Sequence, residues 1–256
     1  MAYSRFDLSG KVAVVIGGTS GIGRAIAMAF TDAGADVVAT SRRRKLVEEV
    51  TLEIRALGRK SIAITTDATD RSALETLVVE VIAHFGRFDV LVNSQGTTNK
   101  KSFLEVRESE WQEVMDANLT SIFRACQIVG RRMVAGGGGR IINVGSLASF
   151  LSFPEVASYC VSKAGVVMLT RVLACEWARY NINVNAIVPG IFRTPLNAEL
   201  LDLPERGGRL LSRVPMGRFG DISELAGTAI YLASDASRYV TGTIVSVDGG
   251  YLANGM

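Results

Sequence analysis

Short apolar runs rich in β-branched residues alternate with longer amphipathic stretches along the chain. This alternation is typical of βαβ units around a parallel sheet. The short runs are almost continuously apolar, which indicates strands that are covered by helices on both faces. We therefore predict an α/β fold with a doubly wound parallel sheet of about seven strands. The predicted strands span residues 12–16, 36–40, 61–65, 88–93, 140–144, 183–188 and 244–247.

The stretches between the strands carry helix signals. Asp70 before Ser72 and Asp221 before Ser223 are suited to N-caps, and the glycines at 136–139 fit a helix end. No linker, repeat or charge block divides the 256 residues, so we predict one domain over 1–256. The predicted helices span residues 21–33, 43–57, 70–85, 108–134, 157–180 and 221–234, and the irregular stretch 193–213 is predicted to form a small lid.

Composition excludes several classes of protein. The 28 Lys and Arg residues against 25 Asp and Glu give a net charge of +3, too weak to indicate nucleic-acid binding. No apolar run approaches the roughly 18 residues of a membrane span. The three cysteines form no C-x-x-C pair, and no secretory leader is recognisable, so we expect free thiols and a cytoplasmic protein. His84 is the single histidine, and we predict neither a metal site nor a Ser-His-Asp triad.

A glycine-rich turn follows the first predicted strand and opens the first predicted helix. Glycines at such a turn let the backbone approach a pyrophosphate, and the helix N-terminus attracts its negative charge. The spacing is G-x-x-x-G-x-G, not G-x-G-x-x-G, but the position of the turn between a buried strand and a helix predicts a dinucleotide site. The predicted contacts are Gly17, Thr19, Ser20, Gly21, Ile22 and Gly23.

The end of the second predicted strand favours NADP(H) over NAD(H). An acidic residue there would bind the ribose hydroxyls of NAD and repel a 2′-phosphate, but this chain continues with Ser41, Arg42 and Arg43. Arginine forms charge-assisted contacts with phosphate, and Arg42 is the first candidate. After the third predicted strand, Asp67 and Ala68 are expected near the adenine, where Asp67 could accept from the amino group or serve as a turn residue.

Tyr159 and Lys163 stand four residues apart in a predicted helix, so their side chains share one face. A nearby ammonium favours the phenolate over the phenol, and a phenol of lowered pKa can exchange a proton with an alcohol or carbonyl oxygen. Ser146 follows a predicted strand and could hold the same oxygen by a hydrogen bond.

These motifs, in this order, resemble the short-chain dehydrogenase/reductase family over essentially the whole chain. The resemblance implies a seven-stranded Rossmann-like sheet and a homotetramer, or a dimer. It also implies a catalytic tetrad, in which Tyr159 is the general acid/base, Lys163 lowers its pKa, Ser146 orients the substrate and Asn118 holds a relay water. Further cofactor contacts are implied at Asn93, Gly96, Pro189, Gly190, Ile191 and Thr194, besides Tyr159 and Lys163 themselves.

Two positions depart from the family pattern. Ile16 replaces the usual threonine before the glycine turn, and the segment after the fourth predicted strand reads Asn93-Ser94-Gln95-Gly96 instead of Asn-Asn-Ala-Gly. Ile16 lacks the hydroxyl of the usual threonine, and Gln95 adds an amide side chain. We expect these two changes to alter the hydrogen bonds near the adenine ribose and thereby the affinity for the cofactor.

The predicted activity is hydride transfer between NADP(H) and a carbonyl or secondary alcohol of a small molecule. The C-terminal third most resembles the sugar-acid and polyol dehydrogenases of the family, notably in residues 193–197, 215–220 and 248–252. One alternative is a 3-oxoacyl-[acyl-carrier-protein] reductase, which would need a basic docking surface. The other is a non-catalytic NADP-sensing regulator, although such proteins commonly lose the tyrosine or the lysine that this chain keeps. We expect neither a nucleic-acid nor a membrane partner.

Overall fold

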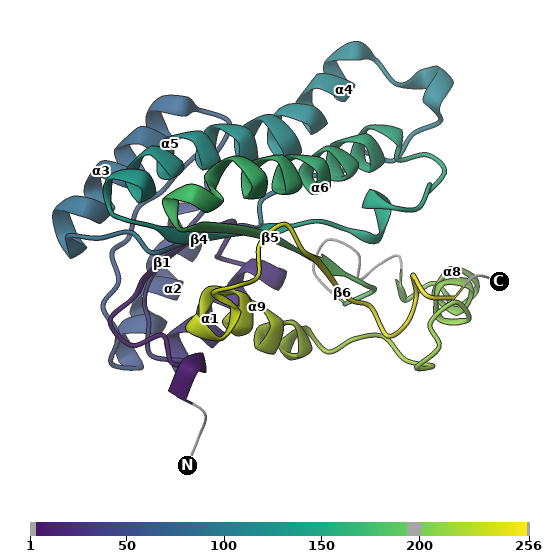
Figure 1. Cartoon of the computed structure of the whole chain (residues 1–256). Helices are drawn as coiled ribbons and strands as arrows, with labels where there is room; N and C mark the ends of the chain where they lie inside the picture. Colours follow the sequence, from purple (N-terminus) through teal and green to yellow (C-terminus); the bar gives the residue numbers. More distant parts are fainter. Residues whose placement is uncertain (1–3, 194–200, 255–256) are drawn as a thin grey trace.

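The computed structural model describes residues 4–193 and 201–254, and within them six parallel strands form one sheet in the order β2-β1-β3-β4-β5-β6 (Figure 1). The predicted doubly wound α/β fold is confirmed. The strands are β1 (Val12–Ile16), β2 (Asp36–Thr40), β3 (Val90–Asn93), β4 (Gly139–Val144), β5 (Ile182–Pro189) and β6 (Ile244–Val247).

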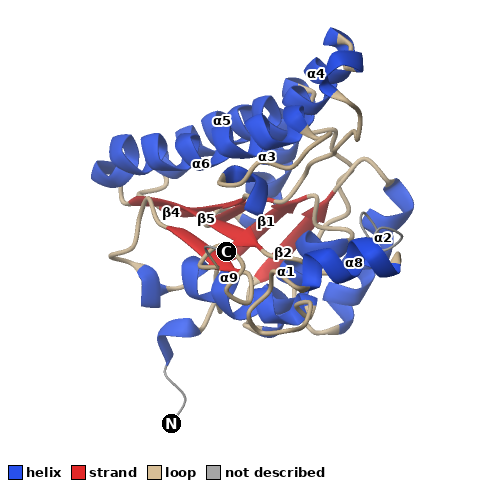
Figure 2. Cartoon of the chain, turned by 90° about the vertical axis from the view of Figure 1, so that its right-hand side faces the viewer, coloured by secondary structure: helices blue, strands red, loops and turns tan. Residues whose placement is uncertain are grey.

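Helices cover both faces of the sheet (Figure 2). On one face lie α3 (Arg71–Phe85), α5 (Ser121–Ala135) and α6 (Ala157–Trp177), and on the other lie α1 (Gly21–Asp32), α2 (Arg44–Ala56) and α9 (Ala226–Ala233). Because successive strand residues point to opposite faces of the sheet, the side chains of β1 pack in two apolar cores, one on each face. Val14 and Ile16 pack in the first, while Ala13 and Val15 pack in the second.

The predicted strand at 61–65 is wrong. This segment runs beside β2 at the edge of the sheet, but it makes ladder-like backbone bonds only at its ends, from Val37 N to Lys60 O (3.1 Å) and from Thr66 N to Ser41 O (3.0 Å). Side chains take the carbonyls in between: the Arg55 guanidinium donates to Ser61 O, and Thr40 Oγ1 donates to Ile64 O. The segment therefore lies beside β2 without forming a regular strand.

The predicted helix over 108–134 is also wrong in one respect, because a turn of π-helix interrupts it. α4 (Glu108–Met115) leads into the π-helical turn η3 (Asp116–Thr120), and α5 follows directly. The predicted caps are confirmed, since Asp70 accepts from Ser72 N at 2.8 Å and Asp221 accepts from Ser223 N at 2.9 Å. The 3-10 turn η6 (Ile222–Leu225) precedes α9, and α8 (Pro204–Leu211) lies in the predicted lid.

One helical stretch of the described residues, Ala157–Tyr180, is long and apolar enough to cross a membrane by length and composition alone. It comprises α6 and the 3-10 turn after it. α6 packs Val166, Leu173 and Ala174 into the first apolar core, as a core helix of an α/β fold does.

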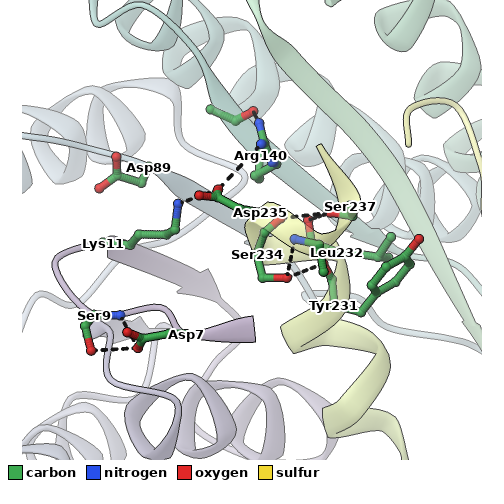
Figure 3. Close-up of polar contacts among 12 residues, drawn as sticks. Asp7, Ser9, Lys11, Asp89, Arg140, Tyr231, Leu232, Ser234, Asp235 and Ser237 are labelled. Carbon is green, nitrogen blue, oxygen red and sulfur yellow. Dashed lines mark hydrogen bonds and ion pairs between the residues drawn. The ribbon is translucent and has the colours of Figure 1, made fainter. Parts of the chain in front are cut away.

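An ion-pair cluster ties the last helices to the amino edge of the sheet (Figure 3). Asp235, just after α9, pairs with Lys11 at 3.1 Å and with Arg140 of β4 at 4.0 Å. Arg140 is largely buried, its Nε has no partner among the described residues, and burial lowers its pKa. Asp235 is therefore the counter-charge that makes this position tolerable for a guanidinium.

We expect Asp235→Asn to lower the free energy of unfolding at pH 7 by about 1 kcal/mol, because Arg140 loses its counter-charge while the 61% exposure of the Asp235 side chain limits the effect. The hydrogen bond from Lys11 lowers the pKa of Asp235 below its ordinary 3.8, so this stabilisation is present above that pH and is lost as pH falls further. Denaturant titrations at several pH values measure both.

Glu48→Gln is the matched control, since it removes the exposed i,i+4 pair with Arg44 and should cost less than about 0.5 kcal/mol. Equal losses in the two variants would contradict the role given to Asp235.

Candidate active site

The glycine turn closes tightly against the end of β3. Gly17 has a φ of +77°, and a Cβ there would lie 2.8 Å from the backbone of Ser94 and Gln95. A Cβ at Gly23 would lie 2.2 Å from Gly17 O. Strands β1 and β3 are neighbours in the sheet, although β2 comes between them in the sequence and pairs with the other side of β1. This contact therefore lies at the topological switch point, where open α/β sheets bind ligands.

The start of α1 is free to bind an anion. Its N-cap, Ser20, is extended and makes no capping hydrogen bond to the first turn. Instead, Ser20 Oγ accepts from Arg43 Nη2 at 2.8 Å, and Thr19 Oγ1 donates to Ser41 Oγ at 2.8 Å. These contacts join the glycine turn to the end of β2, and the backbone N–H groups at Gly21, Ile22 and Gly23 remain for a phosphate.

Arg42 and Arg43 have different surroundings. Arg43 is held by Ser20 and by the bond from its own N to Ser41 Oγ at 3.2 Å. Arg42 is exposed and has no hydrogen bond or ion pair to any residue that the structure describes. Its guanidinium can therefore bind a ligand without breaking a contact.

Two predicted adenine-side residues have structural roles. Asp67 Oδ1 accepts from Thr69 N at 2.9 Å and from Thr69 Oγ1 at 2.7 Å, so Asp67 is the turn residue before α3, and its neighbour Ala68 packs in the core. Asn93 is fully buried and donates to Asn143 Oδ1 at 2.8 Å. Its side chain is therefore held within the sheet, between β3 and β4.

The four tetrad residues come from three segments at the carboxyl edge of the sheet. Asn118 lies in η3, Ser146 caps the 3-10 turn after β4, and Tyr159 and Lys163 share a face of α6. Lys163 Nζ lies 5.9 Å from the centre of the Tyr159 ring and donates to Val144 O at 2.9 Å. Lys163 thus ties the face of α6 that carries Tyr159 to the end of β4, next to the segment of Ser146.

Gly96 is the point where Asn118 and Lys163 converge. A Cβ at Gly96 would lie 3.1 Å from Asn118 Oδ1 and 3.7 Å from Lys163 Nζ. Asn118 is fully buried and is fixed by three bonds: from Thr97 N (2.7 Å), to Thr97 O (2.8 Å) and to Ser162 Oγ (3.0 Å). Sequence reasoning missed Thr97 and Ser162, although each stands next to a motif residue.

Burial controls the protonation of the pair on α6. It raises the pKa of Tyr159, and a hydrogen bond with Ser146 only partly opposes this. Burial also lowers the pKa of Lys163 to about 8. The net direction for Tyr159 is opposite to the one expected from the sequence, because desolvation of the phenolate outweighs the favourable contacts that the protein provides.

The remaining predicted contacts lie after β5. Pro189 ends the strand, Gly190 N donates to Val247 O at 2.8 Å, and a Cβ at Gly190 would lie 2.5 Å from Asp248 Cα. Ile191 lines a cavity of about 420 Å³ between this segment and the C-terminal turn. Thr194 lies outside the described residues.

Fold and site together define an oxidoreductase: the chain belongs to the short-chain dehydrogenase/reductase family. Residues 17–252 match the family profile described as Enoyl-(Acyl carrier protein) reductase. The chain is 41% identical over 256 residues to the 2-dehydro-3-deoxy-D-gluconate 5-dehydrogenase of Escherichia coli K12, which covers 99% of this chain and 100% of that protein.

Two further relatives differ in what they act on. The structure of a gluconate 5-dehydrogenase from Burkholderia cenocepacia J2315, in complex with NADP and tartrate, has a TM-score of 0.95 and 35% identity, and the match covers 99% of each chain. The 3-oxoacyl-[acyl-carrier-protein] reductase of Thermotoga maritima is 37% identical over 244 residues, 95% of this chain and 98% of that protein.

The buried Lys163 makes folding pH-dependent. In the unfolded chain its pKa returns to 10.5, so between about pH 8 and 10.5 the unfolded chain binds more protons than the folded one. The free energy of unfolding therefore rises with pH in this window, by about 3 kcal/mol for this group. We expect Lys163→Met to flatten that rise in denaturant titrations from pH 7 to 10.

Lys45→Met is the control, because Lys45 is exposed on α2 and its removal should leave the slope unchanged. A Lys163→Met curve parallel to that of the parent protein would show that Lys163 does not lose its proton in this range.

Proposed function

We propose that the chain is an NADP(H)-dependent oxidoreductase that acts on a carbonyl or secondary alcohol of a sugar acid or polyol. The observation that carries the proposal is the convergence of Tyr159, Lys163, Ser146 and Asn118 beside the glycine turn, at the switch point of the sheet. The relatives that act on deoxygluconate and gluconate support the substrate class. The domain is taken as residues 1–256.

The residues present fit NADP. Glycine at positions 17 and 23 lets the turn close against the end of β3 and against itself, where no side chain would fit. The first turn of α1 behind this turn offers its N–H groups to the pyrophosphate. Arg42 is assigned to the 2′-phosphate, and Ser41 and Arg43 shape its surroundings. Pro189, Gly190, Ile191 and Thr194 are assigned to the nicotinamide carboxamide, and the backbone of Asn93 and Gly96 to the adenosine side.

Tyr159 moves the proton of the reaction. In the oxidative direction its phenolate accepts the proton of the substrate hydroxyl, while Ser146 holds the same oxygen by a hydrogen bond. A bound NADP would supply the acceptor for the hydride of the substrate carbon. Lys163 and Asn118 connect Tyr159 to a proton path, and because the pKa of Tyr159 is raised, the phenol form that serves carbonyl reduction dominates at neutral pH.

The carrier-protein alternative finds little support in the charges near the site. Lys100 pairs with Glu155 at 2.9 Å, and Lys101 pairs with Glu110 at 3.1 Å. The arginines at 131–132 are exposed near the end of α5, which runs antiparallel to the strands and ends at the opposite edge of the sheet. These cations do not form one docking surface at the active site. The regulator alternative is disfavoured because both Tyr159 and Lys163 are retained, with Lys163 buried and Tyr159 half-buried.

We further propose a homotetramer, or a dimer, in the cytoplasm. The outer faces of α5 and α6 carry exposed apolar side chains, namely Phe123, Val161, Met168 and Val172, which would be covered in an assembly. All three cysteines are free thiols, as suits a reducing compartment.

The test of the function is the absorbance of NADPH with purified protein, sugar acids, polyols and an acetoacetyl thioester. We expect the protein to turn over a sugar acid faster with NADP than with NAD. In Tyr159→Phe, kcat should fall by at least about 100-fold, since a general acid/base contributes that much. Turnover of the thioester alone would favour the acyl reductase, and tight NADP binding without turnover would favour the regulator.

The assignment of Arg42 predicts a change in cofactor preference. Arg42→Ala should weaken NADP binding about 10- to 100-fold, because one charge-assisted phosphate contact is lost, and should leave NAD binding almost unchanged. Cofactor titrations followed by fluorescence measure both constants.

Arg44→Ala is the matched control, because this exposed arginine of α2 is already paired with Glu48 at 2.7 Å. It should change NADP affinity less than about threefold. An equal loss of NADP and NAD affinity in Arg42→Ala would contradict the assignment.

A further inference from the structure

The amide of Gln95 does not face the glycine turn. Its Nε2 donates to Ser121 Oγ at 3.1 Å, across the gap between the end of β3 and the start of α5. Ser121 is fully buried, and its own hydroxyl donates to Ala117 O at 2.7 Å. The side chain that departs from the family pattern therefore leads to the turn that carries Asn118.

Ser121 closes that turn with both its backbone and its side chain. Its N–H donates to Asp116 O, five residues earlier, as in a π-helix, while its hydroxyl supplies a donor to Ala117 O. Turns of π-helix inside α-helices are frequent at functional sites. The donor from Gln95 fixes the rotation of the Ser121 hydroxyl toward Ala117, so Gln95 controls how this turn is closed.

Gly96 thus stands between two residues that hold the same turn from different sides. Thr97 binds Asn118 directly through its backbone N–H and carbonyl. Gln95 binds the end of the turn through Ser121. Together they fix the position of Asn118 relative to Lys163, since Asn118 Oδ1 and Lys163 Nζ both lie against Gly96.

Packing alone does not explain a glutamine at this position. The Oε1 atom of Gln95 is buried and has no hydrogen-bond partner among the described residues, which costs stability. A methionine of similar volume would avoid that cost. What methionine cannot supply is the bond to Ser121.

We propose that Gln95 is a positioning residue for catalysis: through Ser121 it holds η3 in the shape that places Asn118 beside Lys163. This rests on the proposed catalytic role of Asn118. The proposal differs from the expectation drawn from the sequence, which connected Gln95 with cofactor affinity.

The main test compares Gln95→Met with Gln127→Met in the purified protein. Gln127 lies on α5, the helix that begins at Ser121, and accepts from Arg71 at 2.7 Å. With NADP and the sugar acid that is turned over, Gln95→Met should lower kcat about tenfold, since small misplacements of catalytic groups cost that much or more. In Gln95→Met, KM and the affinity for NADP should stay the same within error, and Tm should stay the same or rise. Gln127→Met should change kcat less than about twofold.

A mutant cycle with Asn118→Ala tests the route of the effect. If Gln95 acts through Asn118, the double variant Gln95→Met, Asn118→Ala is no slower than Asn118→Ala alone. If the losses in kcat of the two single variants multiply in the double variant, the proposal is overturned. A lower Tm in Gln95→Met, or a loss of NADP affinity as large as its loss of kcat, would also overturn it, because these results would indicate a role in packing or in cofactor binding.

Amide hydrogen exchange separates this inference from the proposed function. We expect faster exchange in residues 116–121 of Gln95→Met, and no change there in Gln127→Met. Unchanged exchange overturns the role of Gln95 whatever the activity. Conversely, full turnover in Asn118→Ala with faster exchange in Gln95→Met would remove the catalytic role of Asn118 and, with it, the catalytic meaning of the Gln95 contact.

Discussion

The close approach of the end of β1 to the end of β3 is the constraint on which the rest of the site depends. Gly17 touches the backbone of Ser94 and Gln95 so closely that no side chain fits between them, and Gly23 meets Gly17 in the same way. Because the chain passes through β2 before it reaches β3, this contact lies where two loops leave the sheet toward opposite faces, the place at which open α/β sheets bind ligands. The glycine turn and the segment from Gln95 to Thr97 are thereby held against each other.

The side chains proposed to be catalytic are held by backbone and buried polar hydrogen bonds. Thr97 fixes Asn118, Ser162 joins Asn118 to the backbone of Tyr159, and Val144 O holds Lys163. Such groups are buried, so each missing partner would be costly and the network has few alternative arrangements. This rigidity suits a reaction in which a proton and a hydride must leave neighbouring atoms in a fixed geometry.

The same burial sets the electrostatic character of the site. It disfavours the charged forms of both Tyr159 and Lys163, raising one pKa and lowering the other. The protein on its own therefore keeps the tyrosine as a proton donor. A positively charged oxidised nicotinamide beside Tyr159 would favour the phenolate, so the cofactor assigned to this site would itself change the balance between donor and acceptor.

The sequence determined the six strands of the sheet, the caps at Asp70 and Asp221, the glycine turn and the spacing of Tyr159 and Lys163. These features follow from local periodicity and from neighbours within one turn or strand. The tertiary structure decided what depends on contacts between distant segments. The carbonyls of Ser61 and Ile64 accept from the side chains of Arg55 and Thr40, in the segment where the sequence predicts a seventh strand. Residues 116–120 form a π-helical turn that Ser121 closes. The tertiary structure also decided where the amide of Gln95 points and in which direction the pKa of Tyr159 moves, since hydrogen-bond partners and desolvation are set only when the chain is packed.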